Sequence, residues 1–154
     1  MGYNISMKTP DSFSSLFSPS SFEKYPIVTV PQRFFDERGE ILNIADGTLG
    51  DVAFITSNKG AVRANHVHNY DWHLTFLISG IMIYQWKESM NSEKQERLEV
   101  SAGQLFYTPS NTPHKMTFLE DSQFIAVSGL HRDKESYEND TKRLNEDFFS
   151  NVEL

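Results

Sequence analysis

Cysteine is missing from all 154 residues of this chain. Disulfide bonds and catalysis by a thiolate are therefore excluded, and any metal ion would need nitrogen or oxygen ligands. A chain without cysteine is also compatible with a reducing compartment. Histidine and carboxylate side chains remain as the candidates for a metal or catalytic site.

Long apolar runs and an excess of basic residues are also lacking. No stretch approaches the roughly 20 consecutive apolar residues of a membrane span, and the N-terminus has no basic segment followed by an apolar one. The formal net charge is −7, and no run of Lys and Arg offers a surface for phosphate backbones. We therefore expect a soluble, cytoplasmic protein that binds neither membranes nor nucleic acids.

Aromatic residues are abundant, with 12 Phe, 6 Tyr and 2 Trp. From Tyr25 onward, apolar segments separated by turn-forming residues recur at close spacing, the pattern of a sandwich or barrel. The predicted strands are 27–30, 41–44, 52–56, the segment with His66 and His68, 74–79, 81–87, 97–100, 105–108, 114–118 and 123–127. Because 81–87 directly follows Gly80, it and 74–79 are expected to form one long strand kinked at that glycine.

The two ends of the chain differ in composition from the middle. Residues 1–25 are rich in serine and phenylalanine, which predicts an N-terminal arm held against its own domain or a second subunit. Residues 26–130 form the predicted β domain. Residues 131–154 are charged and predict a C-terminal tail, of turns and a short helix, that packs on the barrel.

Histidines are concentrated in residues 60–80. His66 and His68 lie two positions apart, so on a strand they point to the same side. His73 opens an apolar run that predicts a second strand folding back beside the first. His114 arrives from far downstream, after a strand and a proline-containing turn. We expect these four imidazoles to meet at one point.

Four neutral imidazoles suit a divalent metal ion, and Zn, Ni, Fe and Mn are all compatible. Because no carboxylate would offset the charge of the ion, such a site is a strong Lewis acid and favours an anionic ligand. His73 has a second interpretation, as a supporting group or a base, which leaves three histidine ligands. A lone histidine is more often structural or on the surface.

These spacings resemble the two motifs of the cupin superfamily. The positions shared with the first motif are Gly60, His66, His68 and Gly80. Those shared with the second are Gly103, Pro109 and His114. The chain departs from the family at His73, which replaces a glutamate, at Asn111, which replaces a glycine, and at Phe118, which replaces an asparagine. The resemblance covers residues 27–130 and implies an all-β cupin jelly-roll, a β-sandwich or small barrel with a ligand site in its mouth.

A closer resemblance is to the sugar-nucleotide 3,4-ketoisomerases and the dTDP-4-dehydrorhamnose 3,5-epimerase-like (RmlC-like) cupins. It rests on the segments DERGE (36–40), GAVRANHVH (60–68), PHKM (113–116) and YENDTKR (137–143). The resemblance implies a homodimer in which His66 or His68 transfers a proton, without metal, beside the carbonyl of a nucleotide-linked keto-sugar. His73 departs from it, because the ketoisomerases have a glutamine there, and a fourth histidine favours metal capture.

Other side chains complete the candidate site. Tyr84 and Tyr107 are candidates for the acid that partners the histidine base. The candidates for substrate binding are Arg38, Arg63, Trp72 and Trp86. The resemblance places the two arginines near a diphosphate, although a surface ion pair is the commoner role of an arginine. Core packing is the commoner role of the aromatics, and Asp71 can orient a histidine.

The patterns together predict a metal-binding cupin that acts as an isomerase or epimerase. Its substrate would be a nucleotide-linked or other small anionic carbohydrate, and its chemistry proton transfer next to a carbonyl polarised by the ion. Two alternatives remain open. One is a histidine-ligated iron site of the dioxygenase type, and the other is a ligand-binding cupin without catalysis.

Overall fold

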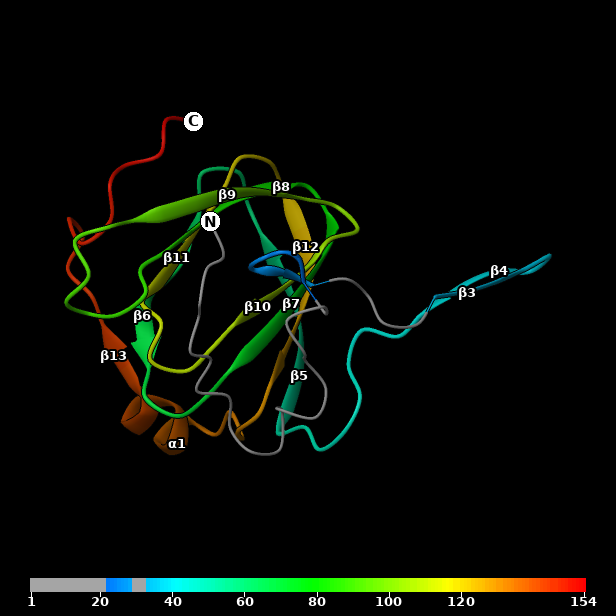
Figure 1. The fold of residues 1–154 in the computed structure, drawn as a ribbon, viewed down its shortest axis with the longest axis horizontal. Coiled ribbons are helices and arrows are strands. Elements are labelled where there is room, and N and C mark those ends of the chain that lie inside the picture. The colour runs from blue at the N-terminus through cyan, green and yellow to red at the C-terminus, as the bar shows by residue number, and fades with distance from the viewer. Residues whose placement is uncertain (1–21, 29–32) are drawn as a thin grey trace.

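Two antiparallel sheets packed face to face form the body of the protein, as predicted (Figure 1). The computed structural model describes residues 22–28 and 33–154. One sheet has the strand order β1 (Phe22–Lys24), β2 (Ile27–Val28), β10 (Leu105–Thr108), β7 (His73–Ser79), β12 (Ser122–Ser128) and β5 (Asp51–Ser57). The other has the order β13 (Thr141–Arg143), β6 (Val62–His68), β11 (His114–Phe118), β8 (Ile81–Trp86) and β9 (Glu96–Ser101). The predicted cupin jelly-roll is confirmed.

The main core lies between the two sheets, because alternate side chains of each strand point inward. Its buried members from the six-stranded sheet are Ile27, Leu77, Phe106, Phe124 and Ala126. Those from the five-stranded sheet are Met82, Tyr84, Val100 and Phe118. Burial of these large side chains supplies the main favourable term for folding.

A second apolar cluster lies on the outer face of the six-stranded sheet. Its buried members are Val28, Trp72, Leu74, Leu105, Tyr107 and Val127. Residues 43–49 cover part of this face, with Ile44, Ala45 and Leu49 packed against the cluster. The sheet is therefore apolar on both faces, unlike a sheet with one face in water.

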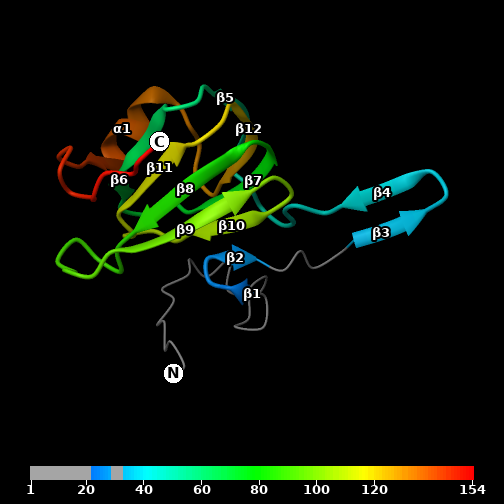
Figure 2. The ribbon, with the colours of Figure 1, turned by 90° about the horizontal axis from the view of Figure 1, so that it is seen from above.

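A hairpin of β3 (Arg33–Asp36) and β4 (Gly39–Leu42) extends away from the body (Figures 1 and 2). The sequence predicted a strand at 41–44 and none at 33–36, so this hairpin is a correction. Seven of its eight strand residues are exposed, so the alternation of apolar and polar residues by which strands are recognised is absent here. Of the predicted strand 27–30, only 27–28 lie among the described residues.

Gly80 corrects a second prediction. The segments 73–79 and 81–86 do not continue one strand; they belong to different sheets, and the chain crosses from one sheet to the other at this glycine. Its φ is +90°, and a β-carbon there would collide with Ser122 Oγ and lie 2.8 Å from the carbonyl oxygen of Asp121. Only glycine fits both conditions.

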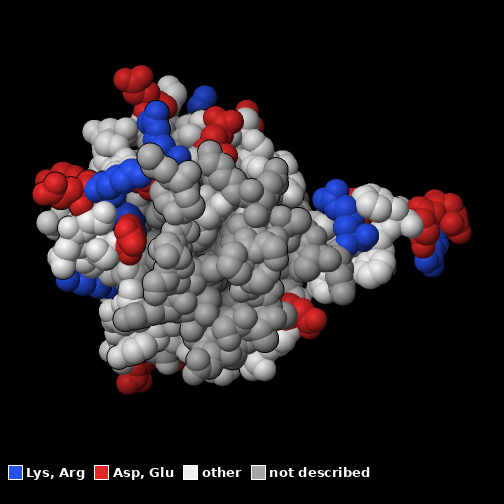
Figure 3. Space-filling model, viewed as in Figure 1, with Lys and Arg blue, Asp and Glu red and all other residues white. Residues whose placement is uncertain are grey.

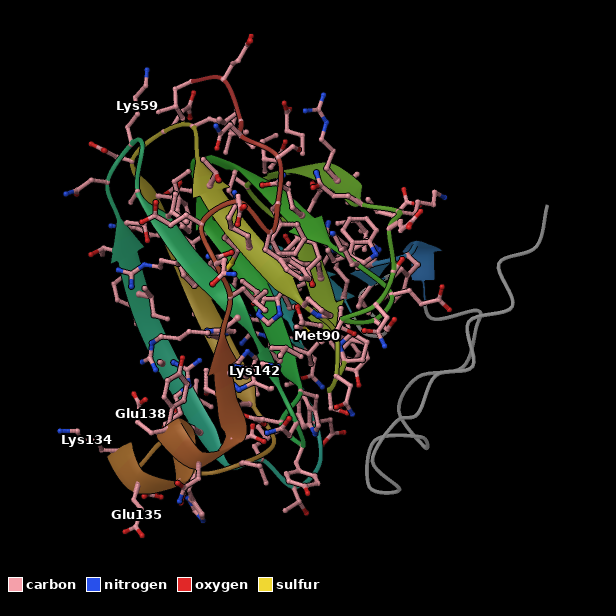
Figure 4. All side chains as sticks on the ribbon, turned by 90° about the vertical axis from the view of Figure 1, so that its left-hand side faces the viewer. Lys59, Met90, Lys134, Glu135, Glu138 and Lys142 are labelled. Atoms are coloured by element: carbon pink, nitrogen blue, oxygen red, sulfur yellow. The ribbon has the colours of Figure 1, made fainter. Side chains whose placement is uncertain are left out.

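The end of the chain adds a helix and a strand. Helix α1 (Lys134–Asp140) begins at Asp133, whose side chain accepts a hydrogen bond from the Ser136 amide. Strand β13 follows and pairs with β6. Figure 4 shows Lys134 and Glu135 on the outer side of α1, pointing away from the barrel, whereas Glu138 pairs with Arg143 of β13. Among the described residues, no helix has the length and apolar character that crossing a membrane requires.

The predicted N-terminal arm is only partly described. Residues 1–21 lie outside the described residues. Residues 22–24 of the arm form β1, the edge strand of the six-stranded sheet.

Candidate functional site

Strand β6 carries His66 and His68, and its backbone is unusual just before them. Ala64 and Asn65 have positive φ values of 61° and 54°, and the register with β11 shifts at this point, as in a β-bulge. Asn65 Nδ2 donates to the carbonyl of Leu144, and the Leu144 amide donates to the carbonyl of Asn65. The C-terminal segment therefore holds a strained stretch that directs His66 inward, and such strain is concentrated at functional sites.

Three histidines from two neighbouring strands come together in the interior. The register places His114 of β11 opposite His66 of β6. The ring centroid of His66 lies 4.4 Å from that of His68 and 4.8 Å from that of His114. One ring nitrogen of each of the three lies within 4.8 Å of the others, and all three side chains are buried. The sequence therefore located this cluster.

His73 reaches the cluster from the opposite sheet. The prediction that its strand lies beside that of His66 is wrong, since β7 pairs with β10 and β12. Its ring centroid lies 4.6 Å from that of His68 and 6.4 Å from that of His114. Its Nε2 lies 3.1 Å from Asp71 Oδ2 and donates to that carboxylate. The geometry thus fits the second interpretation of His73, as a group beside three ligands.

Asp71 is fixed from several sides. Its Oδ1 accepts hydrogen bonds from the amides of Trp72, Gly129 and Leu130. Burial raises the pKa of Asp71, but the hydrogen bond and charge of His73, together with the Leu130 amide, outweigh it and hold this pKa below its usual value. The carboxylate therefore orients the His73 ring.

Asp140, the last residue of α1, holds His68 in the same way. His68 Nδ1 lies 3.2 Å from Asp140 Oδ2 and 3.3 Å from Thr141 Oγ1. The Thr141 hydroxyl donates to the Tyr137 carbonyl, so towards His68 it can only accept. Both neighbours of His68 Nδ1 are therefore acceptors, which places the ring proton on Nδ1 and the lone pair on Nε2.

The histidines of the cluster are held neutral. Burial, with smaller contributions from neighbouring imidazoles, lowers the pKa of His114 to about 3 and the pKa of His66 further still. Burial also lowers the pKa of His68, and the charge of His73 adds to this, while Asp71 and Asp140 partly oppose it. At neutral pH the three imidazoles therefore present lone pairs, as a general base or a metal ligand must.

The residues present fit a metal ion. His68 Nε2 is buried and has no hydrogen-bond partner among the described residues. His114 Nδ1 donates to the Thr112 carbonyl at 2.8 Å, which leaves its Nε2 as the lone pair. Three neutral imidazoles, of which His68 and His114 have fixed tautomers, are a ligand set that zinc and other divalent transition metals accept.

The two candidate acids occupy different environments. Tyr84 lies 6.1 Å from His114 between ring centroids, and its hydroxyl hydrogen-bonds Thr108 Oγ1 at 2.8 Å. Burial, with the charge of Tyr25, holds the pKa of Tyr84 well above its usual value. Tyr107 belongs to the outer apolar cluster with Trp72, on the face of its sheet opposite the main core. Among these two, only Tyr84 lies beside the histidines.

The four candidate substrate-binding residues are dispersed. Trp86 stacks on Tyr84 at 5.3 Å between ring centroids, so it lies near the cluster. Trp72 packs in the outer cluster. Arg63 donates to Ser57 Oγ and to the Thr56 carbonyl at the edge of β5. Arg38 lies in the turn of the projecting hairpin, paired with Asp36 and outside the barrel of its own chain.

The sequence reasoning missed Asp140, Tyr137 and Arg132 as members of the site. The Tyr137 ring centroid lies 5.6 Å from that of His68 and 6.3 Å from that of His66. Arg132 covers the Tyr137 ring at 5.8 Å, and its charge contributes to lowering the pKa of His66. The segment 137–143, which resembles the sugar-nucleotide ketoisomerases, contains Tyr137 and Asp140. Nothing in its sequence indicates that α1 folds back over the histidines.

Part of this chain matches a known protein family in sequence. Residues 53–128 match the family described as the cupin domain. No curated protein matches the chain in sequence.

Several solved structures share the fold. One is the dTDP-4-dehydrorhamnose 3,5-epimerase from Sulfolobus tokodaii, which is 17% identical, with 77% of this chain and 76% of that chain covered and a TM-score of 0.62. Another is a variant of the sugar 3,4-ketoisomerase QdtA from Thermoanaerobacterium thermosaccharolyticum in complex with TDP-4-keto-6-deoxyglucose, with 17% identity, coverage of 80% and 91%, and a TM-score of 0.62. A third is ChmJ, a 3'-monoepimerase from Streptomyces bikiniensis in complex with dTDP-quinovose, with 13% identity, coverage of 79% and 70%, and a TM-score of 0.64.

At these identities the likeness concerns the fold. Residues 53–128 thus belong to the cupin domain family, and the jelly-roll of the chain is shared with solved structures of sugar-nucleotide epimerases and ketoisomerases.

Proposed function

We propose that this protein is an isomerase or epimerase that moves a proton next to the carbonyl of a nucleotide-linked keto-sugar. The observation that carries the proposal is the pair of His68 and Asp140, with Nε2 of His68 buried and unpartnered among the described residues. A neutral imidazole whose far nitrogen is held by a carboxylate is a general base with a fixed direction of attack. The structures of similar fold with bound TDP-4-keto-6-deoxyglucose and dTDP-quinovose support the substrate class.

His68 Nε2 takes the proton from the carbon beside the carbonyl. The electrons of the broken C–H bond pass into an enolate, whose charge rests on the former carbonyl oxygen. Asp140 stabilises the imidazolium that forms, because its carboxylate already accepts from Nδ1. Return of the proton to the other face of the same carbon inverts that centre. Return to the former carbonyl carbon, while the proton of the adjacent hydroxyl passes to the former carbonyl oxygen, moves the carbonyl to the adjacent carbon. The same base thus serves epimerisation or isomerisation.

Tyr84 is the candidate for the group that returns the proton. Burial keeps its phenol protonated, and its hydroxyl forms a hydrogen bond with Thr108 within the core beside His114. Tyr107 packs in the outer cluster, away from the histidines, so it has no part in the proposed reaction.

A metal-dependent form of the enzyme is a second candidate, favoured by the convergence of three ring nitrogens. His66, His68 and His114 would hold a divalent ion, which when bound polarises the carbonyl of the substrate. His68 could not then act as the base. His73, oriented by Asp71, would remain to accept the proton.

Product analysis tests the proposal. The protein is incubated with TDP-4-keto-6-deoxyglucose, with and without a chelator, and the sugar is followed by NMR spectroscopy. We expect a new keto-sugar isomer or epimer, whose formation is lost in His68→Asn and kept in His131→Asn, which alters the exposed fifth histidine. An unchanged substrate, for this and other nucleotide-linked 4-keto-sugars, would contradict the proposal. Metal analysis of protein purified without an affinity tag, with loss of activity on chelation, would select the metal-dependent form.

A further inference from the structure

Arg132 lies beside the candidate site with unused hydrogen-bond donors. Its side chain is 27% exposed, and its Nε is buried without an acceptor. Asp51 Oδ2 lies 3.7 Å from this nitrogen, which is beyond hydrogen-bond distance. Among the described residues, no other group accepts a hydrogen bond from the guanidinium. Because a buried charged donor without a partner costs free energy, this arrangement indicates a ligand that accepts from Arg132.

The other described arginines are engaged elsewhere or lie in water. The two arginines of the projecting hairpin pair with acidic residues of the same hairpin, which carries both signs in Figure 3. Arg63 donates to the edge of β5, and Arg143 pairs with a glutamate of α1. The arginine of β9 is exposed. Within the described part of the chain, Arg132 is therefore the arginine that combines a largely buried side chain with unused donors.

The backbone holds Arg132 between two fixed points. On one side, the amides of residues 129–130 donate to Asp71, the carboxylate that also orients His73. On the other side, Asp133 begins α1, and its side chain accepts from an amide of the first turn. The guanidinium is thus placed in advance of any reaction. A donor that is already in place stabilises a developing charge without the cost of reorganisation.

The guanidinium lies on the side of the histidine cluster that α1 covers. Its Cζ lies 5.8 Å from the centroid of the Tyr137 ring. That ring lies 5.6 Å from His68 and 6.3 Å from His66 between centroids. Burial and the neighbouring histidines lower the pKa of His66, and the charge of Arg132 adds to this effect. The positive charge of Arg132 therefore acts within the region where the histidine base works.

The reaction proposed above creates a single negative charge in this region. When the C–H bond breaks, its proton passes to His68 Nε2, a carbon–carbon double bond forms, and the electrons of the carbonyl double bond move onto the oxygen. The enolate oxygen is a stronger acceptor than the ketone oxygen of the substrate. A hydrogen bond from a cation in a site shielded from water therefore favours the enolate over the substrate. Arginine stays protonated throughout, so Arg132 takes no part in the proton transfer itself.

A diphosphate matches Arg132 less well than an enolate does. A diphosphate carries several negative charges, and the Asp51 carboxylate beside the guanidinium would repel it. The same carboxylate offsets part of the charge of Arg132. A partly offset cation suits the single, delocalised charge of an enolate.

We propose that Arg132 is a catalytic residue whose N–H groups donate to the enolate oxygen formed when His68 removes the proton. This role rests on the proton transfer proposed above and adds to it the group that stabilises the negative charge. When the proton returns to carbon, the charge on the oxygen disappears and the hydrogen bond weakens, which allows the product to leave.

Kinetics of Arg132→Gln with TDP-4-keto-6-deoxyglucose, followed by NMR spectroscopy, give the first test. We expect kcat to fall about 100-fold or more and KM to change less than about threefold, as loss of a donor to a developing oxyanion does. The dissociation constant of TDP, measured by calorimetry, should stay close to that of the wild type. Arg132→Lys keeps the charge and should recover about tenfold or more of the lost kcat. Arg97→Gln, which alters the exposed arginine of β9, is the matched control and should keep the wild-type kcat.

Asp51→Asn separates this role from a structural one and decides the question even if Arg132→Gln does not fold. Removing the carboxylate leaves the charge of Arg132 in place, so we expect kcat at or above that of the wild type. An equal fall of kcat in Asp51→Asn and Arg132→Gln would overturn the role, because an ion pair that only supports the fold is lost in both. Wild-type kcat in Arg132→Gln, or TDP binding weakened as much as kcat, would overturn it too, and the latter result would assign Arg132 to the diphosphate. A wild type that converts no nucleotide-linked 4-keto-sugar would instead overturn the proposed function, and this role with it.

Discussion

Asp140 is the residue on which the proposed chemistry depends most closely after the histidines themselves. Its Oδ2 accepts from His68 Nδ1, and its two oxygens also accept from the amides of Tyr70 and Asp71. One carboxylate thus fixes the tautomer of His68 and the loop that leads to His73. A residue 72 positions away in the sequence determines how the histidine base is presented.

Replacing Asp140 by Asn tests this role. The amide can donate to His68 Nδ1 and reverse the tautomer, and it cannot balance the charge of an imidazolium. We expect the turnover rate to fall about 100-fold or more, with a smaller change in KM. Glu135→Gln, on the exposed side of the same helix, is the control and should retain the wild-type rate. Equal rates in both variants would show that Asp140 has no part in the reaction.

The depressed pKa values of the histidines predict how stability depends on pH. In the unfolded chain a histidine titrates near 6.5, whereas burial holds the pKa of His114 at about 3 in the folded protein. The unfolded state therefore binds more protons than the folded state below pH 6.5. The contribution of neutral His114 to the free energy of unfolding is complete above pH 6.5 and is lost as the pH falls toward 3. The lowered pKa of His114 alone should reduce the free energy of unfolding by about 2 kcal/mol at pH 5 relative to pH 7.5.

Urea unfolding of metal-free protein at pH 7.5, 6 and 5 measures this dependence. The free energy of unfolding of the wild type should fall over this range, and His114→Asn should show a shallower fall. Parallel curves for the two proteins would mean that His114 is not held neutral by burial. His131→Asn should follow the wild type, because His131 is exposed.

At the scale of elements, two glycines with similar backbone conformation allow the strain of a positive φ to be distinguished from a steric collision. Gly80 and Gly103 have φ values of +90° and +87°. Alanine at either position meets the strain of positive φ, about 1–2 kcal/mol. Only at Gly80 would the new β-carbon also meet other atoms, Ser122 Oγ and the Asp121 carbonyl, while at Gly103 nothing lies within 4 Å.

Thermal unfolding should therefore rank these two variants. Gly103→Ala is expected to lower Tm by about 2–6 °C, and Gly80→Ala by about 8 °C or more, because a forced shift of the crossing between the sheets is added. A smaller effect at Gly80 than at Gly103 would contradict this explanation of the crossing.

Asn65 links the bulge in β6 to the C-terminal segment. Asn65→Ala removes the hydrogen bonds to the Leu144 and Asn145 carbonyls and places a poorer residue at positive φ. We expect a loss of about 1–2 kcal/mol in the free energy of unfolding. We also expect faster amide exchange in β13, measured by hydrogen exchange, because its docking on β6 is weakened. Unchanged exchange in β13 would mean that Asn65 does not hold the tail.

The elements that the sequence predicted well are those that alternate apolar and polar residues or present a continuous apolar run. Strands β7, β10 and β12 were found within one or two residues, since each presents such a pattern to the core. Strand β3 was missed, and β4 was predicted two residues too late, because the residues of this hairpin are nearly all exposed. Strand β13 was missed because a three-residue polar segment becomes a strand only through its pairing with β6.

For the whole molecule, the sequence predicted the jelly-roll and the meeting of the histidines, because its two motifs carry a resemblance to the cupins that implies both. It did not predict from which sheet each histidine comes, since strand pairing between distant segments has no local signal. It also could not place Arg38 and Trp72. Arg38 lies on the hairpin outside the barrel, and Trp72 packs on the outer face of the six-stranded sheet.

The central claim is that His68, backed by Asp140, transfers a proton at carbon. It is tested most directly by NMR measurement of solvent deuterium entering TDP-4-keto-6-deoxyglucose in D₂O. We expect deuterium at the carbon next to the carbonyl with the wild type and with His131→Asn, and little with His68→Asn. Turnover without deuterium uptake, or equal uptake in His68→Asn and the wild type, would contradict it.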